Sequence, residues 1–277
     1  MRTIRWLTCY LPKYDKMKYI FPLLLLILVY SSARTQETKV YFGLGGQYNS
    51  FQDARFSDVQ FNKFSVVPEI GFYRISTVDY LYLKANAFVF ETAFPDSDTI
   101  EMATSGYTVK LGYLRNYKGH FIGGSWTVVD YASRDNNLLG NNSNFYRLAS
   151  DIFVSWKYMY TLNNNWNIDL GVDYGLLSFI NTAPSFTTNF PQNVVDNGEV
   201  SFLDASSRDP YNLGNMTAKY FWNQLNISSI LRANFRNRLS LAYEWRVRSY
   251  SDNSGYPVSD ATHSIILQFN FISHTKN

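Results

Sequence analysis

The segment from 166 to 180, WNIDLGVDYGLLSFI, alternates large apolar residues with polar or small ones. The apolar residues are Ile168, Leu170, Val172, Tyr174 and Leu176, and the residues between them are Asn167, Asp169, Gly171, Asp173 and Gly175. Successive side chains of a β-strand point to opposite sides, so a period of two predicts a strand with two unlike faces. A strand of a soluble sandwich has the same pattern, and the rest of the chain must distinguish the two folds.

The same alternation recurs about ten times in the chain. The predicted strands cover 39–50, 63–75, 78–91, 105–116, 120–131, 146–162, 166–180, 220–235, 239–249 and 263–271. Pro68 is the one residue that fits its strand poorly, because a proline donates no hydrogen bond to the neighbouring strand.

The connections between these strands alternate in length. STVD, NYKG, LNNN and RNR are short, whereas the connections over 51–62, 92–104, 132–145, 181–219 and 250–262 are long. A transmembrane barrel has short periplasmic turns and long extracellular loops, but a soluble sandwich has no reason to separate its loops by length. We therefore predict an all-β fold, an antiparallel up-and-down transmembrane β-barrel of about ten strands with both ends of the chain in the periplasm.

Residues 17–33, MKYIFPLLLLILVYSSA, have the pattern of a signal peptide cleaved near Ala33. Lys18 precedes an apolar core of 11 residues, which is shorter than the roughly 20 that a membrane-spanning helix needs. Either Met1 or Met17 is the start of translation. The predicted organisation is an N-terminal extension and signal peptide over 1–33 and an outer-membrane barrel over 34–277.

Cleavage of this leader changes the charge of the chain. The leader holds five of the 25 basic residues and one of the 22 acidic residues, so 20 basic and 21 acidic residues remain. The basic character belongs to the leader, which argues against a nucleic-acid partner. The only cysteine, Cys9, is lost as well, and the mature chain has no thiol for a disulfide, a cysteine metal site or a lipid anchor. Aromatic residues make up 18% of the chain, as expected for a barrel that places them at both membrane interfaces.

Charged residues occur on the alternate face of several predicted strands. A charge that faced lipid near the midplane would cost about 2–4 kcal/mol, so these side chains should point into the lumen. They are Glu69, Lys84, Lys110, Asp151, Lys157, Asp169, Asp173, Arg232, Glu244, Arg246 and Arg248. One interpretation is a structural ion-pair network that fills a narrow lumen. The other is a selectivity filter, in which Arg232, Arg246 and Arg248 would favour anions.

The sequence indicates no catalytic, cofactor or metal site, and we predict that the protein is not an enzyme. Histidine is scarce, and HExxH and EF-hand spacings are absent. His263 and Ser264 are similar to the His and Ser of barrel lipid hydrolases, but adjacent strand residues point to opposite faces and cannot form one dyad.

From Glu37 onwards the chain resembles the superfamily of small bacterial outer-membrane β-barrel proteins, especially those of Bacteroidota. The resemblance rests on the pattern of strands, on VYFGLGGQYN after the leader and on HSIILQFNF near the end. It implies a Gram-negative outer membrane, with membrane lipid and the barrel-assembly machinery as partners. In that superfamily an aromatic-ended last strand is the assembly signal, a role that would fall to Phe269 and Phe271. The chain departs from many members by continuing for six residues, ISHTKN.

The 181–219 connection is the longest and carries several apolar residues, so it should be partly ordered. It could cover the barrel mouth or present a surface to an envelope protein or a surface ligand. The predicted function is a structural or surface-interaction component of the cell envelope. The alternatives are a narrow pore for small, anionic solutes and, third, a barrel hydrolase.

Overall fold

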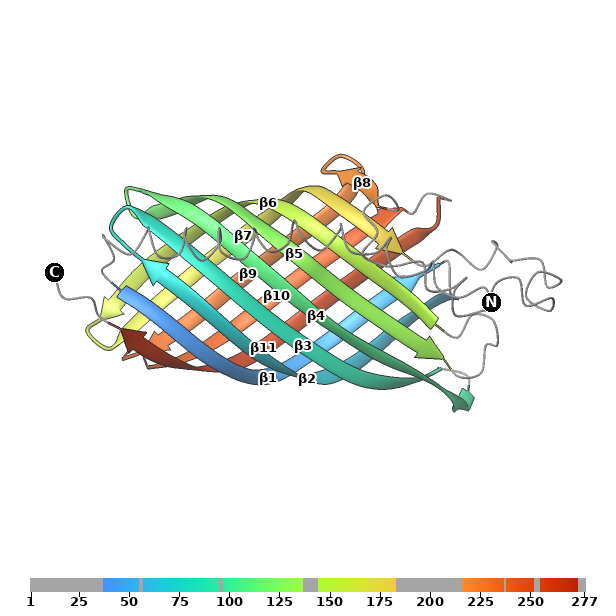
Figure 1. Cartoon of the computed structure of the whole chain (residues 1–277). Coiled ribbons are helices and arrows are strands. Elements are labelled where there is room, and N and C mark those ends of the chain that lie inside the picture. The colour runs from blue at the N-terminus through green and yellow to red at the C-terminus, as the bar shows by residue number, and fades with distance from the viewer. Residues whose placement is uncertain are drawn as a thin grey trace, which may run out of the picture.

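A computed structural model of the chain describes residues 37–54, 57–94, 97–136, 144–182, 216–236, 238–251 and 255–273. These residues form eleven β-strands (Figure 1). They are β1 (Glu37–Asp53), β2 (Ser57–Ile75), β3 (Asp79–Phe94), β4 (Ser97–Tyr117), β5 (His120–Asn136), β6 (Asn144–Asn163), β7 (Trp166–Thr182), β8 (Thr217–Tyr220), β9 (Gln224–Phe235), β10 (Leu239–Ser251) and β11 (Pro257–Ser273). The described residues contain no helix of the length and hydropathy that crossing a membrane would require.

The strands form one antiparallel sheet that closes on itself into a barrel (Figure 1). Strands β1 to β7 pair in sequence order, β1 also pairs with β11, and β10, β9 and β7 complete the circle. The short β8 and the longer β9 both pair with β7, at different positions along it. They therefore share one place in a wall of ten strands. This arrangement confirms the predicted all-β, up-and-down barrel of about ten strands.

Four tight turns lie at one end of the barrel, after β2, β4, β6 and β9. In the first turn the backbone amides of Val78 and Asp79 donate hydrogen bonds to the Ser76 hydroxyl at 3.1 and 2.9 Å. In the second, Lys118 and Gly119 have φ angles of 55° and 90°, as the two central residues of a type I′ hairpin turn require. The predicted short connections are confirmed.

The connections at the opposite end are shorter than predicted, because the strands continue past their predicted ends. β1 pairs with β2 as far as Asp53 and Ser57, and β3 pairs with β4 as far as Phe94 and Ser97. The predicted loops over 51–62, 92–104 and 250–262 were therefore too long, and most of their residues belong to strands.

The apolar side of a strand changes near this end of the barrel. In β1 the large outward side chains from Val40 to Tyr48 are apolar and exposed, but Phe51, farther along, is buried on the inward face. In β2, Phe64 is exposed whereas Phe61 is buried and stacks on Phe51 with ring centroids 5.1 Å apart. This reversal is expected where a strand leaves lipid for water, because lipid favours apolar side chains outside and water favours them inside.

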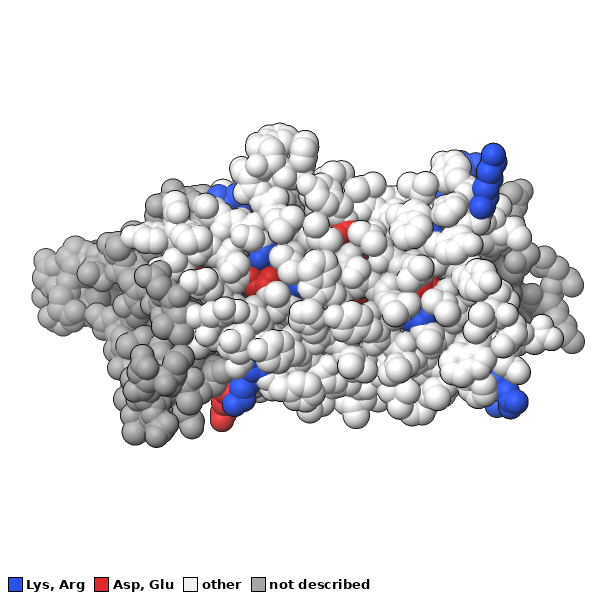
Figure 2. Space-filling view, turned by 180° about the vertical axis from the view of Figure 1, so that it is seen from behind, with Lys and Arg blue, Asp and Glu red and all other residues white. Residues whose placement is uncertain are grey.

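Between this reversal and the end with the tight turns, the outer wall of the barrel is apolar. Exposed large apolar residues include Phe42, Leu44, Val66, Ile70, Val89, Ile122, Val154, Val172, Leu231, Leu241, Ile265 and Leu267. Figure 2 shows one side of the barrel as a mainly uncharged surface. A continuous apolar surface of this kind is unfavourable in water and is rare on soluble proteins. The apolar stretch covers nine residues of β1 (Val40–Tyr48) and of β2 (Phe64–Phe72), which is about the length that crosses a membrane as a tilted strand. The barrel therefore spans a membrane.

Several irregularities interrupt the ladders, and three of them lie within the strands of the apolar band. In β5, Val128 is an extra residue, because Thr127 pairs with Lys110 and Val129 with Val109. In β7, Leu176 is an extra residue of the same kind opposite β6. In β2, the ladder to β3 has no pairs at Val67 and Pro68 although the register is the same on both sides of the gap. Pro68 thus remains in its strand, and the break in pairing is the consequence expected of a residue without an amide hydrogen.

Candidate functional site: the charged lumen

All eleven charged residues predicted for the lumen lie on the inward faces of their strands and are buried or half-buried. They are Glu69 on β2, Lys84 on β3, Lys110 on β4, Asp151 and Lys157 on β6, Asp169 and Asp173 on β7, Arg232 on β9, and Glu244, Arg246 and Arg248 on β10. The structure brings them together with three more charged side chains, Asp130, Arg147 and Asp260, which the sequence-based set did not include. The fourteen side chains comprise seven cations and seven carboxylates.

Six of these side chains form a compact Arg–Asp cluster in the half of the lumen away from the tight turns. It consists of Asp130, Arg147, Asp151, Arg246, Arg248 and Asp260. Asp130 lies at its centre and accepts from Arg246 and Arg248 at 2.8 Å each and from Arg147 at 3.4 Å. Asp151 pairs with Arg248 and, at 3.3 Å, with Arg246.

The ion pair between Arg147 and Asp260 extends the Arg–Asp cluster to β11, the strand next to β10. The partners are far apart around the wall. β5 and β10 are four strands apart in a ring of ten, as are β6 and β11. The ion pairs therefore cross the lumen and do not merely run along its wall. Because every carboxylate of the cluster meets at least one guanidinium, the desolvation cost of each buried charge is offset by its partners.

The bulge at Val128 explains why the sequence did not reveal Asp130. Counted with strict period two from Ser125 and Thr127, Asp130 would face lipid. The extra residue restores the inward direction, so Asp130 pairs with Thr108 in the ladder and is 3% exposed. The available signal was the adjacent pair Val128-Val129, which breaks the alternation just before the acid. Asp260 was missed for another reason, because it fell in a connection predicted to be a loop.

Two further groups of charges occupy the middle of the lumen. Lys84 donates to both carboxylate oxygens of Glu244 at 2.7 and 2.6 Å and lies 3.9 Å from Glu69. Glu69 also accepts from the Gln268 amide at 2.8 Å. Lys110 pairs with Asp173 at 2.6 Å. Two of these ion pairs again join strands that are not neighbours, since Lys84 on β3 pairs with Glu244 on β10 and Lys110 on β4 pairs with Asp173 on β7.

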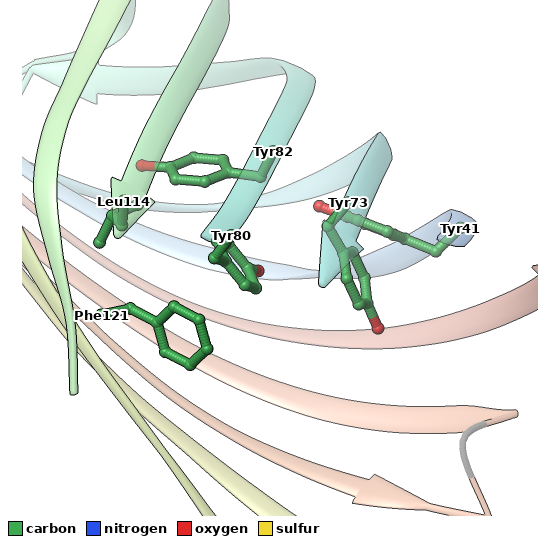
Figure 3. Close-up of a cluster of buried hydrophobic side chains, with 6 residues drawn as sticks. All are labelled: Tyr41, Tyr73, Tyr80, Tyr82, Leu114 and Phe121. Atoms are coloured by element: carbon green, nitrogen blue, oxygen red, sulfur yellow. The ribbon is translucent and has the colours of Figure 1, made fainter. Parts of the chain in front are cut away.

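An aromatic layer occupies the end of the lumen near the tight turns (Figure 3). Its buried members are Tyr41, Tyr73, Tyr80, Tyr82, Leu114 and Phe121. The Tyr80 and Phe121 rings meet edge to face with centroids 5.9 Å apart. The Tyr41 and Tyr82 rings lie over Gly71 and Gly112 on the next strands, where any larger side chain would overlap them. Glycines opposite tyrosines thus provide the space for the layer.

Two cations are packed against the aromatic layer. Lys157 lies 4.4 and 4.1 Å from the ring centroids of Tyr80 and Tyr82. The Arg232 guanidinium lies 5.4 Å from the Tyr73 ring and 3.8 Å from the Asp169 carboxylate. Both arrangements stabilise a buried cation partly through the negative faces of aromatic rings.

A smaller apolar group lies at the opposite end of the lumen, formed by the buried residues Ala149, Ile180, Tyr250 and Val258. Between the two ends is an internal cavity of about 140 Å³. Its lining combines aromatic residues with six cations, Lys84, Lys110, Arg147, Lys157, Arg232 and Arg246, and four carboxylates, Asp130, Asp173, Glu244 and Asp260.

The two histidines among the described residues, His120 and His263, lie outside this site. His263 points outward and its ring nitrogen contacts the Tyr243 hydroxyl at 2.7 Å, whereas Ser264 is buried and donates to the Gln47 side chain at 3.2 Å. His120 is also on the outer wall, where it accepts from Trp156 at 3.3 Å. The two members of the His263–Ser264 pair therefore face opposite sides of the wall. In the part of the chain that the structure describes, no group of His, Cys, Asp and Glu side chains has a metal-site arrangement.

Comparison with known proteins gives likenesses of shape alone. No protein-family model matches the sequence, and no curated protein matches it. Among solved structures, the chain is similar to the outer membrane protease OmpT from Escherichia coli, with a TM-score of 0.46 and 8% identity over 86% of this chain and 97% of that one. It is also similar to the translocator domain of the autotransporter NalP from Neisseria meningitidis, with a TM-score of 0.43 and 7% identity over 92% and 96% of the two chains. For Ail of Yersinia pestis the TM-score is 0.31, with 7% identity over 84% and 99%. At these identities and TM-scores we base no functional conclusion on the likenesses.

Proposed function

We propose that this protein is a β-barrel of a Gram-negative outer membrane that serves as a structural or surface-interaction component of the cell envelope. The observation that carries the proposal is the Arg–Asp cluster, whose ion pairs tie β5 and β6 to β10 and β11 across the lumen. Mutually paired charges in a narrow lumen favour a rigid, closed wall over an open path for ions. In this proposal the leader is cleaved near Ala33, and the barrel-assembly machinery recognises the last strand through the outward-facing Phe269 and Phe271.

The proposal that the lumen is closed to ions is tested by single-channel recording of the refolded protein in a planar bilayer. We expect no discrete current from the wild-type barrel, because the Arg–Asp cluster crosses the lumen and the aromatic layer, with Lys157 and Arg232 packed against it, fills the end near the tight turns. Heat-modifiable gel migration of the same sample confirms that the barrel is folded. Steady, discrete steps from folded protein would contradict the closed lumen.

A second candidate function is a narrow pore for small, anionic solutes. The internal cavity favours it, because six cations and four carboxylates line the space. In the same recordings a pore would give anion-biased steps that weaken when Arg246 and Arg248 are replaced by glutamine. A hydrolytic function receives no support from His263 and Ser264, since they lie on opposite faces of β11.

The surface-interaction part of the proposal concerns the connection over 181–219, most of which lies outside the described residues. We expect a variant in which a two-residue Asn-Gly turn replaces 183–215 to fold normally but to lose its cross-linked partner on intact cells. The matched control replaces 137–143, a different outer connection, in the same way and should retain the partner. Loss of the same cross-linked species in both variants, or in neither, would contradict this assignment.

A further inference from the structure

In the part of the chain that the structure describes, the outer wall carries a protrusion that the charged lumen does not explain. It is the turn between β8 and β9, which stands out from the barrel at the top of Figure 1 and appears as an uncharged bump in Figure 2. Tyr220, Phe221 and Trp222 form it, and we name these three residues the aromatic knob. Their side chains are 42%, 48% and 68% exposed.

The aromatic knob arises from four extra residues in the wall. β7 pairs with β9 up to Tyr174 and Ile227, and with β8 from Leu177 and Tyr220 onwards. Between these pairs two residues of β7 face six residues of the other chain segment. Hydrogen bonds to the wall can use only part of the longer segment, so the remainder is displaced outward, as at a large β-bulge.

The aromatic knob is held in one conformation. The Tyr220 amide donates to the Asn223 side-chain oxygen at 2.7 Å, and the Asn223 amide donates to the Tyr220 carbonyl at 2.9 Å. A third bond, from the Phe221 amide to the Leu176 carbonyl at 3.0 Å, fixes the turn to β7. The Tyr220 and Trp222 rings stack with centroids 4.7 Å apart and planes 7° apart. The rings are therefore presented as a preformed surface, which costs little ordering entropy on binding.

The residues next to the aromatic knob show where it lies along the barrel axis. Leu225, the first outward residue of β9, is exposed and apolar, and it pairs with Ser249 of β10. Ser249 is the position at which the outward face of β10 becomes polar, after the apolar residues from Leu239 to Val247. Along the barrel axis, the aromatic knob lies just beyond Leu225, toward the end of the barrel away from the tight turns. It therefore lies at the outer edge of the apolar band.

We propose that the aromatic knob is a lipid-binding anchor that inserts at the headgroup boundary of the outer leaflet. Its surface continues the lipid-facing band, and it contains no charged side chain. Bulk water would leave the Phe221 ring unfavourably exposed, and the hydrocarbon centre would leave the Trp222 N–H and the Tyr220 O–H without partners. The boundary provides both environments at once, which is why Trp and Tyr concentrate there. A single anchor of this kind would fix the depth and tilt of the barrel from one side.

The test uses the full barrel refolded into phosphatidylcholine vesicles that contain lipid brominated either near the glycerol backbone or near the chain ends. Subtracting the emission of Trp222→Phe from that of the wild type isolates Trp222. We expect this signal to be quenched about twofold more by the shallow bromine than by the deep bromine. Trp126 on the outer wall of β5, isolated in the same way with Trp126→Phe, serves as the control and should show a weaker preference for the shallow bromine. A Trp222→Tyr variant repeats the subtraction with a residue that retains a hydrogen-bond donor.

Three outcomes would overturn the proposal. Equal or stronger quenching by the deep bromine would place the aromatic knob in the hydrocarbon. Quenching by aqueous iodide without quenching by brominated lipid would place it above the membrane. Lipid quenching that disappears as the protein-to-lipid ratio rises would show that a second copy of the chain covers it. Each outcome is independent of whether the lumen conducts.

Discussion

Replacing Asp130 by asparagine is expected to lower the free energy of unfolding by about 3–5 kcal/mol, because it leaves three buried arginines without their shared carboxylate. Arg147, Arg246 and Arg248 all contact Asp130, and only Asp151 and Asp260 would remain to pair with them. The measurement is urea unfolding of the protein in lipid vesicles, followed by tryptophan fluorescence and heat-modifiable migration.

The matched control for this variant is Asp169→Asn. Asp169 also lies in the lumen, but its one ion pair with a described residue, Arg232, is 3.8 Å long. The loss of stability should therefore be clearly smaller. Combining Asp130→Asn with Arg246→Gln removes one charge of each sign and should recover part of the stability. Equal losses for the two aspartate variants would show that the Arg–Asp cluster has no special role.

Replacing Phe121 by alanine is expected to cost about 3–5 kcal/mol, the usual range for removing a buried phenylalanine ring. Phe121 is 3% exposed and packs against Tyr80 in the aromatic layer. The inward faces of neighbouring strands are fixed by their ladders, so the space left by the ring can collapse only partly. Urea unfolding in vesicles gives the stability, and near-ultraviolet circular dichroism reports the packing of the tyrosines.

Phe121→Leu retains most of the apolar volume and should lose less than half as much stability. A full loss with leucine would indicate that the aromatic contact, and not the filled volume, is what matters. No loss with alanine would mean that the aromatic layer does not stabilise the barrel. Because the variant widens the lumen at this end and leaves the Arg–Asp cluster unchanged, bilayer recording of the folded protein would show whether the Arg–Asp cluster keeps the lumen closed without an intact aromatic layer.

The sequence predicted the strands that lie in lipid well, and there is a physical reason. Within the membrane one face must be apolar and the other can be polar, so residues such as Leu170 and Asp169 reveal their directions directly. The four tight turns followed from their length and from residues such as Lys118 and Gly119. The order of the strands then follows from antiparallel pairing of neighbours.

The same rule explains what the sequence could not predict. Beyond the membrane the apolar side moves inward, as it does between Tyr48 and Phe51, so the alternation changes phase and a continuing strand resembles a loop. At Val128 a single extra residue reverses the faces within a strand, and the direction of Asp130 then depends on the ladder rather than on counting. Pairings such as Arg147 with Asp260 join distant strands and cannot be read from local patterns.

The reversal of the apolar side also determines what a soluble molecule meets at the end of the barrel away from the tight turns. From Tyr48 the β1 strand continues for five residues to Asp53, which corresponds to about 16 Å of paired chain at the usual rise per residue. Above the apolar band β1 and β2 therefore form a paired hairpin with polar outward residues, whereas the ladder between β2 and β3 ends at Val66 and Val89. A soluble molecule that approaches this end of the barrel would meet the paired backbone of this hairpin before it reached lipid. The hairpin thereby sets how far above the bilayer the connection between β1 and β2 begins.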